Sequence, residues 1–110
     1  MKHARRTLDR LSDVIADRRA SPSGDSYTSQ LFAGGVDRIG EKVVEEAREA
    51  VEAAREPGDA GREHLIREAA DLVYHLLVLL AARDAHLADV ETELARRFGV
   101  SGLKEQASRG

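Results

Sequence analysis

The chain has 110 residues, of which 34% are charged, and its formal net charge is −3 because 20 acidic side chains outnumber 17 basic ones. The acidic balance argues against a nucleic-acid or anionic-membrane partner, and the longest apolar run, residues 76–82, is far shorter than the ~18 residues of a membrane-spanning helix. The absence of cysteine excludes disulfides and thiolate metal sites and fits a reducing compartment, so we expect a cytoplasmic protein.

The N-terminal part of the chain predicts one amphipathic helix. The first residues are basic but have no apolar segment behind them, so we expect no secretory signal. Apolar residues then recur at helical spacing over residues 7–19, which predicts a helix there. Residues 20–26 are rich in turn-forming side chains and end it.

The central part of the chain predicts two long helices. Residues 27–32 are expected to form a short helical turn that Gly34 and Gly35 break. A long helix then follows over about residues 36–55, and Pro57 with Gly58 stops it. The next helix is expected over about residues 62–83. Its last two turns are apolar all round, which predicts a central helix that is covered on every side.

The C-terminal part predicts a fourth helix and completes an all-α chain. It is expected over about residues 87–98, with Gly99 as its cap. The side chains that this helix is expected to bury are Leu87, Val90, Leu94 and Phe98. No segment alternates as a strand would, and one core is all that a chain of this length builds. We therefore expect a single all-α domain over residues 1–110.

Two acidic pairs with the same spacing stand on the two long predicted helices. They are Glu46-x-x-Glu49 and Glu68-x-x-Asp71. Residues three apart lie on one side of a helix, so two antiparallel helices can direct these four carboxylates to one point. Converging carboxylates need a cation. Because oxygen atoms are the only ligands offered, that cation should be Mg²⁺ or Mn²⁺.

The helical wheel places these acids at the border of the buried faces. At about 100° per residue, Glu46 and Glu49 lie on one flank of the apolar face of their helix. Glu68, Asp71 and His75 lie on one flank of the next. Border positions also carry ordinary ion pairs, such as Lys42 with Glu46. The spacing alone therefore leaves two interpretations open, a metal site and a solvated charged face.

Two longer segments resemble the phosphoribosyl-ATP pyrophosphohydrolase family. Residues 41–49 carry the first acidic pair, and residues 68–80 run from the second pair into the apolar stretch. This family belongs to the all-α nucleoside triphosphate pyrophosphohydrolases, which include the MazG proteins. Residues 26–35 and 101–109 also resemble the histidine-pathway enzyme. The chain departs from the family pattern in a longer turn before Arg62 and in His86, Lys104 and Gln106.

The resemblance implies a fold and a reaction. The fold is a four-helix, MazG-like bundle completed by homodimerisation, with no cyclohydrolase domain attached. The reaction is hydrolysis of phosphoribosyl-ATP, a small-molecule substrate, to phosphoribosyl-AMP and pyrophosphate in histidine biosynthesis. Water would attack at the α-β phosphate bond with the help of a metal ion.

The resemblance also implies roles for particular residues. The implied Mg²⁺ ligands are Glu46, Glu49, Glu68 and Asp71. Glu45 is the candidate for orienting the attacking water, and Tyr74 is expected to pack. The candidate substrate contacts are Lys42, His75, Ser26, Thr28 and Arg109. Lys42 is equally well explained as an ion-pair partner, and a lone His at a helix border is more often structural.

Two other functions are compatible with the same residues. The first is a MazG-type house-cleaning pyrophosphohydrolase acting on free nucleoside triphosphates. The second is a non-catalytic helical interaction module whose acids only solvate its surface.

Overall fold

Four helices account for most of residues 6–98, the part of the chain that the computed structural model describes. They are α1 (Thr7–Ala20), α2 (Tyr27–Ala54), α3 (Gly58–Ala81) and α4 (Leu87–Phe98). No strand occurs within this part, so the all-α prediction is confirmed. The predicted bounds hold to within a few residues, except that α3 begins one turn earlier than expected. The predicted cap Gly99 lies outside the described residues.

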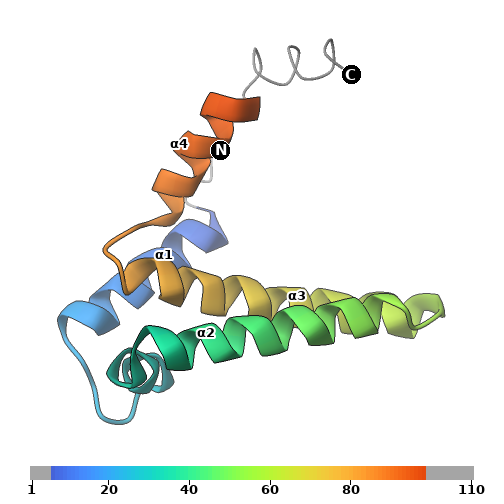
Figure 1. The fold of residues 1–110 in the computed structure, drawn as a ribbon, viewed down its shortest axis with the longest axis horizontal. Helices are drawn as coiled ribbons and strands as arrows, with labels where there is room; N and C mark the ends of the chain where they lie inside the picture. The colour runs from blue at the N-terminus through green and yellow to red at the C-terminus, as the bar shows by residue number, and fades with distance from the viewer. Residues whose placement is uncertain (1–5, 99–110) are drawn as a thin grey trace.

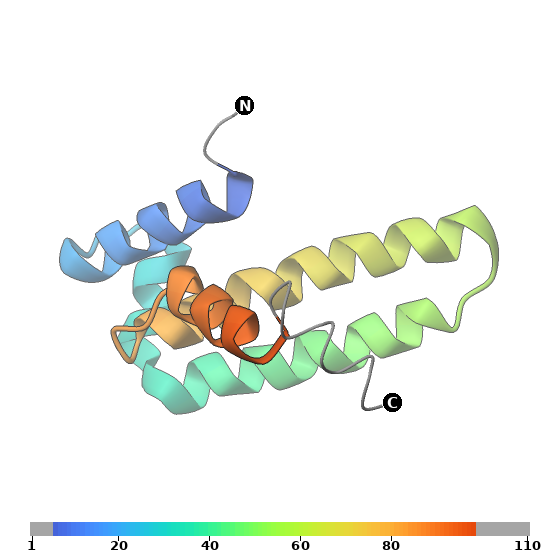
Figure 2. The same cartoon turned by 90° about the horizontal axis from the view of Figure 1, so that it is seen from above.

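Helices α2 and α3 form a long antiparallel hairpin (Figure 1, Figure 2). The turn between them spans only residues 55–57. Pro57 is extended, with φ of −81° and ψ of 163°, and its missing N–H prevents α2 from continuing. Gly58 follows with φ of 73°, a left-handed conformation that favours glycine. The hairpin therefore reverses at the position that the Pro-Gly pair predicted.

A break at Gly35 divides α2 into a short first segment and a long second one. Gly35 has φ of 80° and ψ of −179°, a conformation that is available almost only to glycine. Figure 1 shows the first segment nearly end-on, so it runs steeply across the hairpin. The break predicted at Gly34 and Gly35 is confirmed. It directs the start of α2, with Tyr27 and Thr28, against α3.

The apolar core lies at the end of the hairpin where α1 crosses it. Its buried members are Ile15, Leu31, Ile39, Leu77, Val78 and Ala81. Toward the turn, the buried non-polar positions of the hairpin are small, namely Ala50, Ala53 and Gly61. Small residues let two helices approach closely but bury little apolar area. The far half of the hairpin is therefore weakly held by apolar packing.

Several apolar side chains that the sequence assigned to the interior are exposed in the single chain. Helix α4 has no buried residue, and Leu94 and Phe98 are 50% and 36% exposed. The expectation that α4 buries its apolar side is wrong for Leu94 and Phe98 within the described chain, because α4 projects from the hairpin and packs chiefly on α1 (Figure 1). Leu87, at the start of α4, is partly buried against the core. Leu76 of α3 is also 44% exposed, so α3 is not covered on every side. No described helix has the length and apolar character to cross a membrane.

Candidate metal centre

Three of the four predicted ligands meet between α2 and α3. Carboxylate oxygens of Glu46, Glu68 and Asp71 lie within 4.8 Å of one another. Their meeting follows from the hairpin, because Glu46 and Glu68 stand eleven residues before and after Pro57. Positions equally distant from a tight turn lie level on antiparallel helices. The convergence predicted from the spacing is present for these three, while their role as metal ligands stays a prediction.

Two oxygens of this acidic cluster are buried without a partner. Glu46 is only 7% exposed, although carboxylates are almost never buried unless they are paired. Oε1 of Glu46 and Oε1 of Glu68 have no hydrogen-bond partner among the described residues. Burying an ionised carboxylate without a partner is strongly unfavourable. The cluster therefore requires a proton or a cation, and an all-oxygen donor set suits Mg²⁺ or Mn²⁺.

The electrostatics of Glu46 reflect this crowding. Burial is the main cause that raises the pKa of Glu46 to about 7, and the neighbouring carboxyl groups of Glu68, Glu49 and Asp71 contribute to the same rise. Glu49, the fourth predicted ligand, is outside the group of three converging oxygens but close enough to act on Glu46. The metal-free cluster therefore holds a proton near neutral pH. A bound cation would replace it, since metal ligands must be deprotonated.

Glu45 and Lys42 form an ion pair beside the cluster. Lys42 Nζ lies 3.3 Å from Glu45 Oε1, and the two side chains are 21% and 48% exposed. The hydrogen bond to Glu45 raises the pKa of Lys42, and the charge of Glu46 adds to the effect. The ion-pair interpretation of Lys42 is correct, with Glu45 as the partner in place of Glu46. Both side chains are accessible to a ligand that approaches the acidic cluster.

The predicted contact His75 is buried and fully hydrogen-bonded. It is 5% exposed, and its Nδ1 donates to the backbone oxygen of Asp71 at 2.8 Å. Since a carbonyl can only accept, Nε2 is the unprotonated nitrogen, and it accepts from the Tyr27 hydroxyl at 2.9 Å. Both ring nitrogens are thus engaged within the fold. His75 fixes the Asp71 turn of α3 to the start of α2.

The other predicted contacts also link the start of α2 to its surroundings. Ser26 caps α2, since its hydroxyl accepts from the backbone N–H of Ser29 at 3.2 Å. The Thr28 and Tyr74 hydroxyls are hydrogen-bonded to each other, and the Tyr74 ring stacks on Tyr27 with centroids 6.2 Å apart. Tyr74 packs as predicted. The predicted contact Arg109 lies outside the described residues.

Sequence reasoning missed two residues next to the cluster, His64 and Glu56. His64 Nε2 lies 3.2 Å from Glu68 Oε2, and its Nδ1 lies 3.0 Å from Glu56 Oε1. The spacing of four between His64 and Glu68 was a signal that could have been found, because such residues are neighbours on a helix. Glu56 could not have been found that way, because it reaches His64 across the turn.

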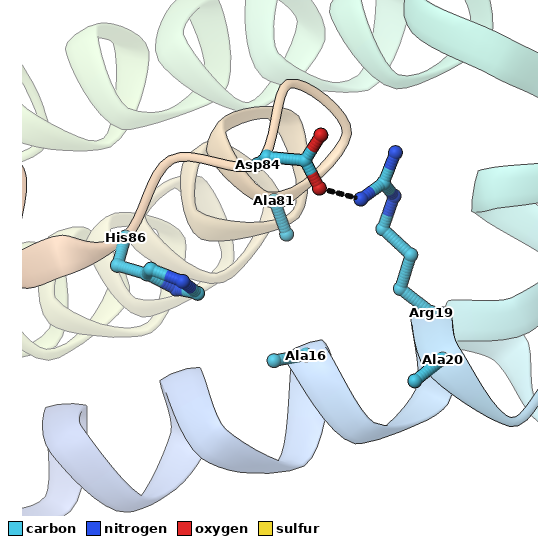
Figure 3. Close-up of a pocket in the computed structure, with 6 residues that line it drawn as sticks. All are labelled: Ala16, Arg19, Ala20, Ala81, Asp84 and His86. Carbon is cyan, nitrogen blue, oxygen red and sulfur yellow. Dashed lines mark hydrogen bonds and ion pairs between the residues drawn. The ribbon is translucent and has the colours of Figure 1, made fainter.

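The pocket shown in Figure 3 lies elsewhere. It has a volume of about 390 Å³ and lies between α1 and the C-terminal end of α3. Its lining residues are Ala16, Arg19, Ala20, Ala81, Asp84 and His86. An ion pair between Arg19 and Asp84 spans its edge. None of the acids of the cluster lines it, so this pocket is not the candidate metal centre.

Comparison with known proteins gives consistent matches over nearly the whole chain. Residues 8–98 match the family model of phosphoribosyl-ATP pyrophosphohydrolase. A phosphoribosyl-ATP pyrophosphatase from Rhodopirellula baltica is 53% identical over 102 residues, which cover 93% of this chain and 85% of the relative. Those from Paracoccus denitrificans and Parvibaculum lavamentivorans are each 52% identical, covering 93% and 94% of this chain and 92% of each relative. All residues of the acidic cluster lie within the matched range.

The replacement Glu46→Gln should remove part of the pH dependence of stability. The pKa of Glu46 is raised from 4.5 to about 7 in the fold, so its protonated form stabilises the metal-free protein fully below about pH 4.5. That stabilisation is lost as the pH rises through about 7. Between about pH 4.5 and pH ~8, the unfolding free energy of the wild type should therefore fall by up to about 3 kcal/mol more than that of the variant. Denaturant unfolding in chelator at several pH values measures this difference, and parallel stability curves would contradict it.

Proposed function

The chain belongs to the phosphoribosyl-ATP pyrophosphohydrolase family, and from this premise we propose how it hydrolyses phosphoribosyl-ATP to phosphoribosyl-AMP and pyrophosphate in histidine biosynthesis. The observation that carries the proposal is the acidic cluster between α2 and α3, in which one oxygen of Glu46 and one of Glu68 are buried without a partner while Asp71 is exposed. A solvated charged face would keep its carboxylates in water. Buried, unpartnered oxygens instead favour a site that a cation and a triphosphate complete.

We assign Glu46, Glu68 and Asp71 as ligands of a divalent cation, Mg²⁺ or Mn²⁺, with Glu49 beside them. The two unpartnered buried oxygens and the all-oxygen donor set support this assignment. When bound, the cation would offset the negative charge of the triphosphate and polarise the phosphate under attack. Without that compensation the cluster and the net charge of −3 would repel the substrate.

The ion pair beside the cluster supplies the remaining chemistry in this proposal. Glu45 is the acceptor for a proton of the attacking water, because its carboxylate is half-exposed and lies next to Glu46 in the chain. As the water oxygen bonds to phosphorus, the bridging α-β P–O bond breaks and pyrophosphate leaves. Lys42 places a positive charge where it can attract the phosphates. Holding both side chains on one turn of α2 fixes their spacing.

We further propose that two copies of the chain form a homodimer through their hairpins. Val44 and Val51 on α2 are 57% and 53% exposed, and Ile66 and Val73 on α3 are 52% and 36% exposed. Each pair is seven residues apart, so each lies along one face of its helix. The radius of gyration, 16.4 Å, also exceeds the roughly 13 Å of a compact chain of this length. A second hairpin packed on these faces would complete a four-helix bundle.

The substrate assignment is tested by pyrophosphate release. Phosphoribosyl-ATP should be hydrolysed with a far higher kcat/KM than any of a panel of ribo- and deoxyribonucleoside triphosphates. A preference for a free nucleoside triphosphate would support the house-cleaning function in its place. No hydrolysis of either would leave the interaction-module interpretation.

The metal assignment separates ligands from the water-orienting residue. At 100 times its dissociation constant, Mg²⁺ should add about 2.7 kcal/mol to the unfolding free energy of the wild type. Asp71→Asn should lose most of this gain. Glu45→Gln should keep it and lower kcat by about 10² to 10⁴-fold.

The matched control for these variants is Glu41→Gln, which removes an exposed carboxylate of α2 that pairs with Arg38 at 3.6 Å. Thermal and denaturant unfolding with and without Mg²⁺, together with steady-state kinetics, give both readouts. A wild type whose stability does not respond to millimolar Mg²⁺ and whose activity survives chelation would contradict the metal assignment.

Replacing Leu76 should separate assembly from folding. Leu76 lies three residues after Val73 on α3 and is 44% exposed in the single chain. Leu76→Asp should therefore give a folded monomer if this side of α3 is buried between two copies. Leu77 is 4% exposed, so Leu77→Asp should unfold the protein by burying a charge. Val14→Asp serves as the control, because Val14 of α1 is 49% exposed. Sedimentation and circular dichroism measure both effects, and a monomeric wild type at micromolar concentration would refute the dimer.

A further inference from the structure

The imidazole of His64 lies between two carboxylates that come from different parts of the hairpin. Its Nδ1 is 3.0 and 3.1 Å from the two carboxylate oxygens of Glu56. Its Nε2 is 3.2 Å from Oε2 of Glu68. Glu56 stands in the turn between α2 and α3, whereas His64 and Glu68 are one turn apart on α3. The three side chains thus form a hydrogen-bonded series that runs from the turn to the acidic cluster.

At the turn, this series begins at Glu56, whose backbone is fixed by close packing. A Cβ at Gly61 would lie 2.2 Å from the backbone oxygen of Glu56, so glycine alone lets the first turns of α3 lie directly on that residue. The backbone N–H of Glu56 also donates to the oxygen of Ala53 at 3.1 Å. The Glu56 backbone is therefore packed on the start of α3 and hydrogen-bonded to the end of α2. Its carboxylate can anchor His64 in one orientation.

At the acidic cluster, the two carboxylate oxygens of Glu68 have different surroundings. Oε2 is hydrogen-bonded to His64, while Oε1 is buried and has no partner among the described residues. A glutamate side chain has several rotatable bonds, and only some of its rotamers direct an oxygen to Glu46 and Asp71. Holding Oε2 leaves Oε1 as the oxygen that is available to the cluster.

We propose that His64 is a positioning residue that orients Glu68 for cation binding, and that Glu56 in turn orients His64. The inference rests on the proposed metal centre. It assigns a function to two residues outside the group of converging carboxylates. Outer hydrogen bonds of this kind stabilise one orientation of a ligand before the cation arrives, and their loss typically lowers metal affinity by about 10 to 100-fold.

The sign of the effect separates positioning from simple electrostatics. Because ionised carboxylates only accept, an imidazole that bonds to Glu56 and Glu68 at once donates from both nitrogens and is positively charged. That charge repels a cation, so loss of the charge alone would strengthen metal binding. An imidazole that orients Glu68 has the opposite effect when it is removed. His64→Ala should therefore weaken Mn²⁺ binding only if the positioning role is correct.

The experiment is a titration of the whole protein with Mn²⁺ alone, followed by electron paramagnetic resonance or calorimetry, without substrate. His64→Ala should raise the Mn²⁺ dissociation constant by about 10 to 100-fold, and Glu56→Gln should raise it by a smaller factor. His64→Gln, whose amide can still donate to Glu68, should recover part of the affinity. His86→Ala removes an exposed imidazole that lines the pocket between α1 and α3, and it should leave the constant unchanged. Circular dichroism establishes that each variant is folded.

The outcomes distinguish this inference from the function on which it rests. A wild type that binds no Mn²⁺ would overturn the metal centre and the positioning role together. A wild type that binds Mn²⁺, with an unchanged or tighter constant in both His64 variants, would overturn the positioning role alone. Equal loss in His64→Gln and His64→Ala would show that the hydrogen bond to Glu68 is not what matters.

Discussion

The interaction with the largest consequences is the burial of Glu46 and of one oxygen of Glu68 between α2 and α3, where the exposed Asp71 joins them. The apolar core is confined to the end of the hairpin that α1 crosses, and the far half contributes small residues and the acidic cluster. Buried acids without partners oppose folding, so the metal-free hairpin is weakened at the proposed metal centre. A cation that neutralises these acids would stabilise the fold and complete the site at once. If these acids bind the cation as proposed, stability and activity are coupled through the same few oxygens.

The short turn between α2 and α3 fixes how the acidic side chains of the two helices lie relative to one another. Pro57 and Gly58 reverse the chain within three residues, which sets Glu46 level with Glu68. Gly61 then lets α3 lie against the backbone of Glu56. Insertion of a single residue in this turn would rotate and shift one acidic pair relative to the other. At the opposite end, the hydrogen bonds of Tyr27 with His75 and of Thr28 with Tyr74 fix the broken start of α2 on α3.

Much of this arrangement could be predicted from the sequence, because it is written in local patterns. Apolar periodicity located the four helices, Pro57 with Gly58 located the hairpin turn, and the matched acidic spacing indicated that Glu46, Glu68 and Asp71 converge. Periodicity shows which side of a helix is apolar but not whether another helix covers it, so the expected burial of Leu94 and Phe98 was wrong in the single chain. The roles of His75 and Glu56 depend on contacts across the fold. His75 is saturated by Tyr27 and the Asp71 backbone, and Glu56 meets His64 only through the turn.

The central claim is that the acidic cluster holds a divalent cation, and anomalous X-ray diffraction from crystals grown with Mn²⁺ tests it most directly. The account predicts an anomalous peak bounded by Glu46, Glu68 and Asp71, with oxygen atoms about 2.0 to 2.3 Å from the ion, as hard cations require. A structure at high Mn²⁺ concentration with no peak there, or with a peak held by other residues, would contradict it.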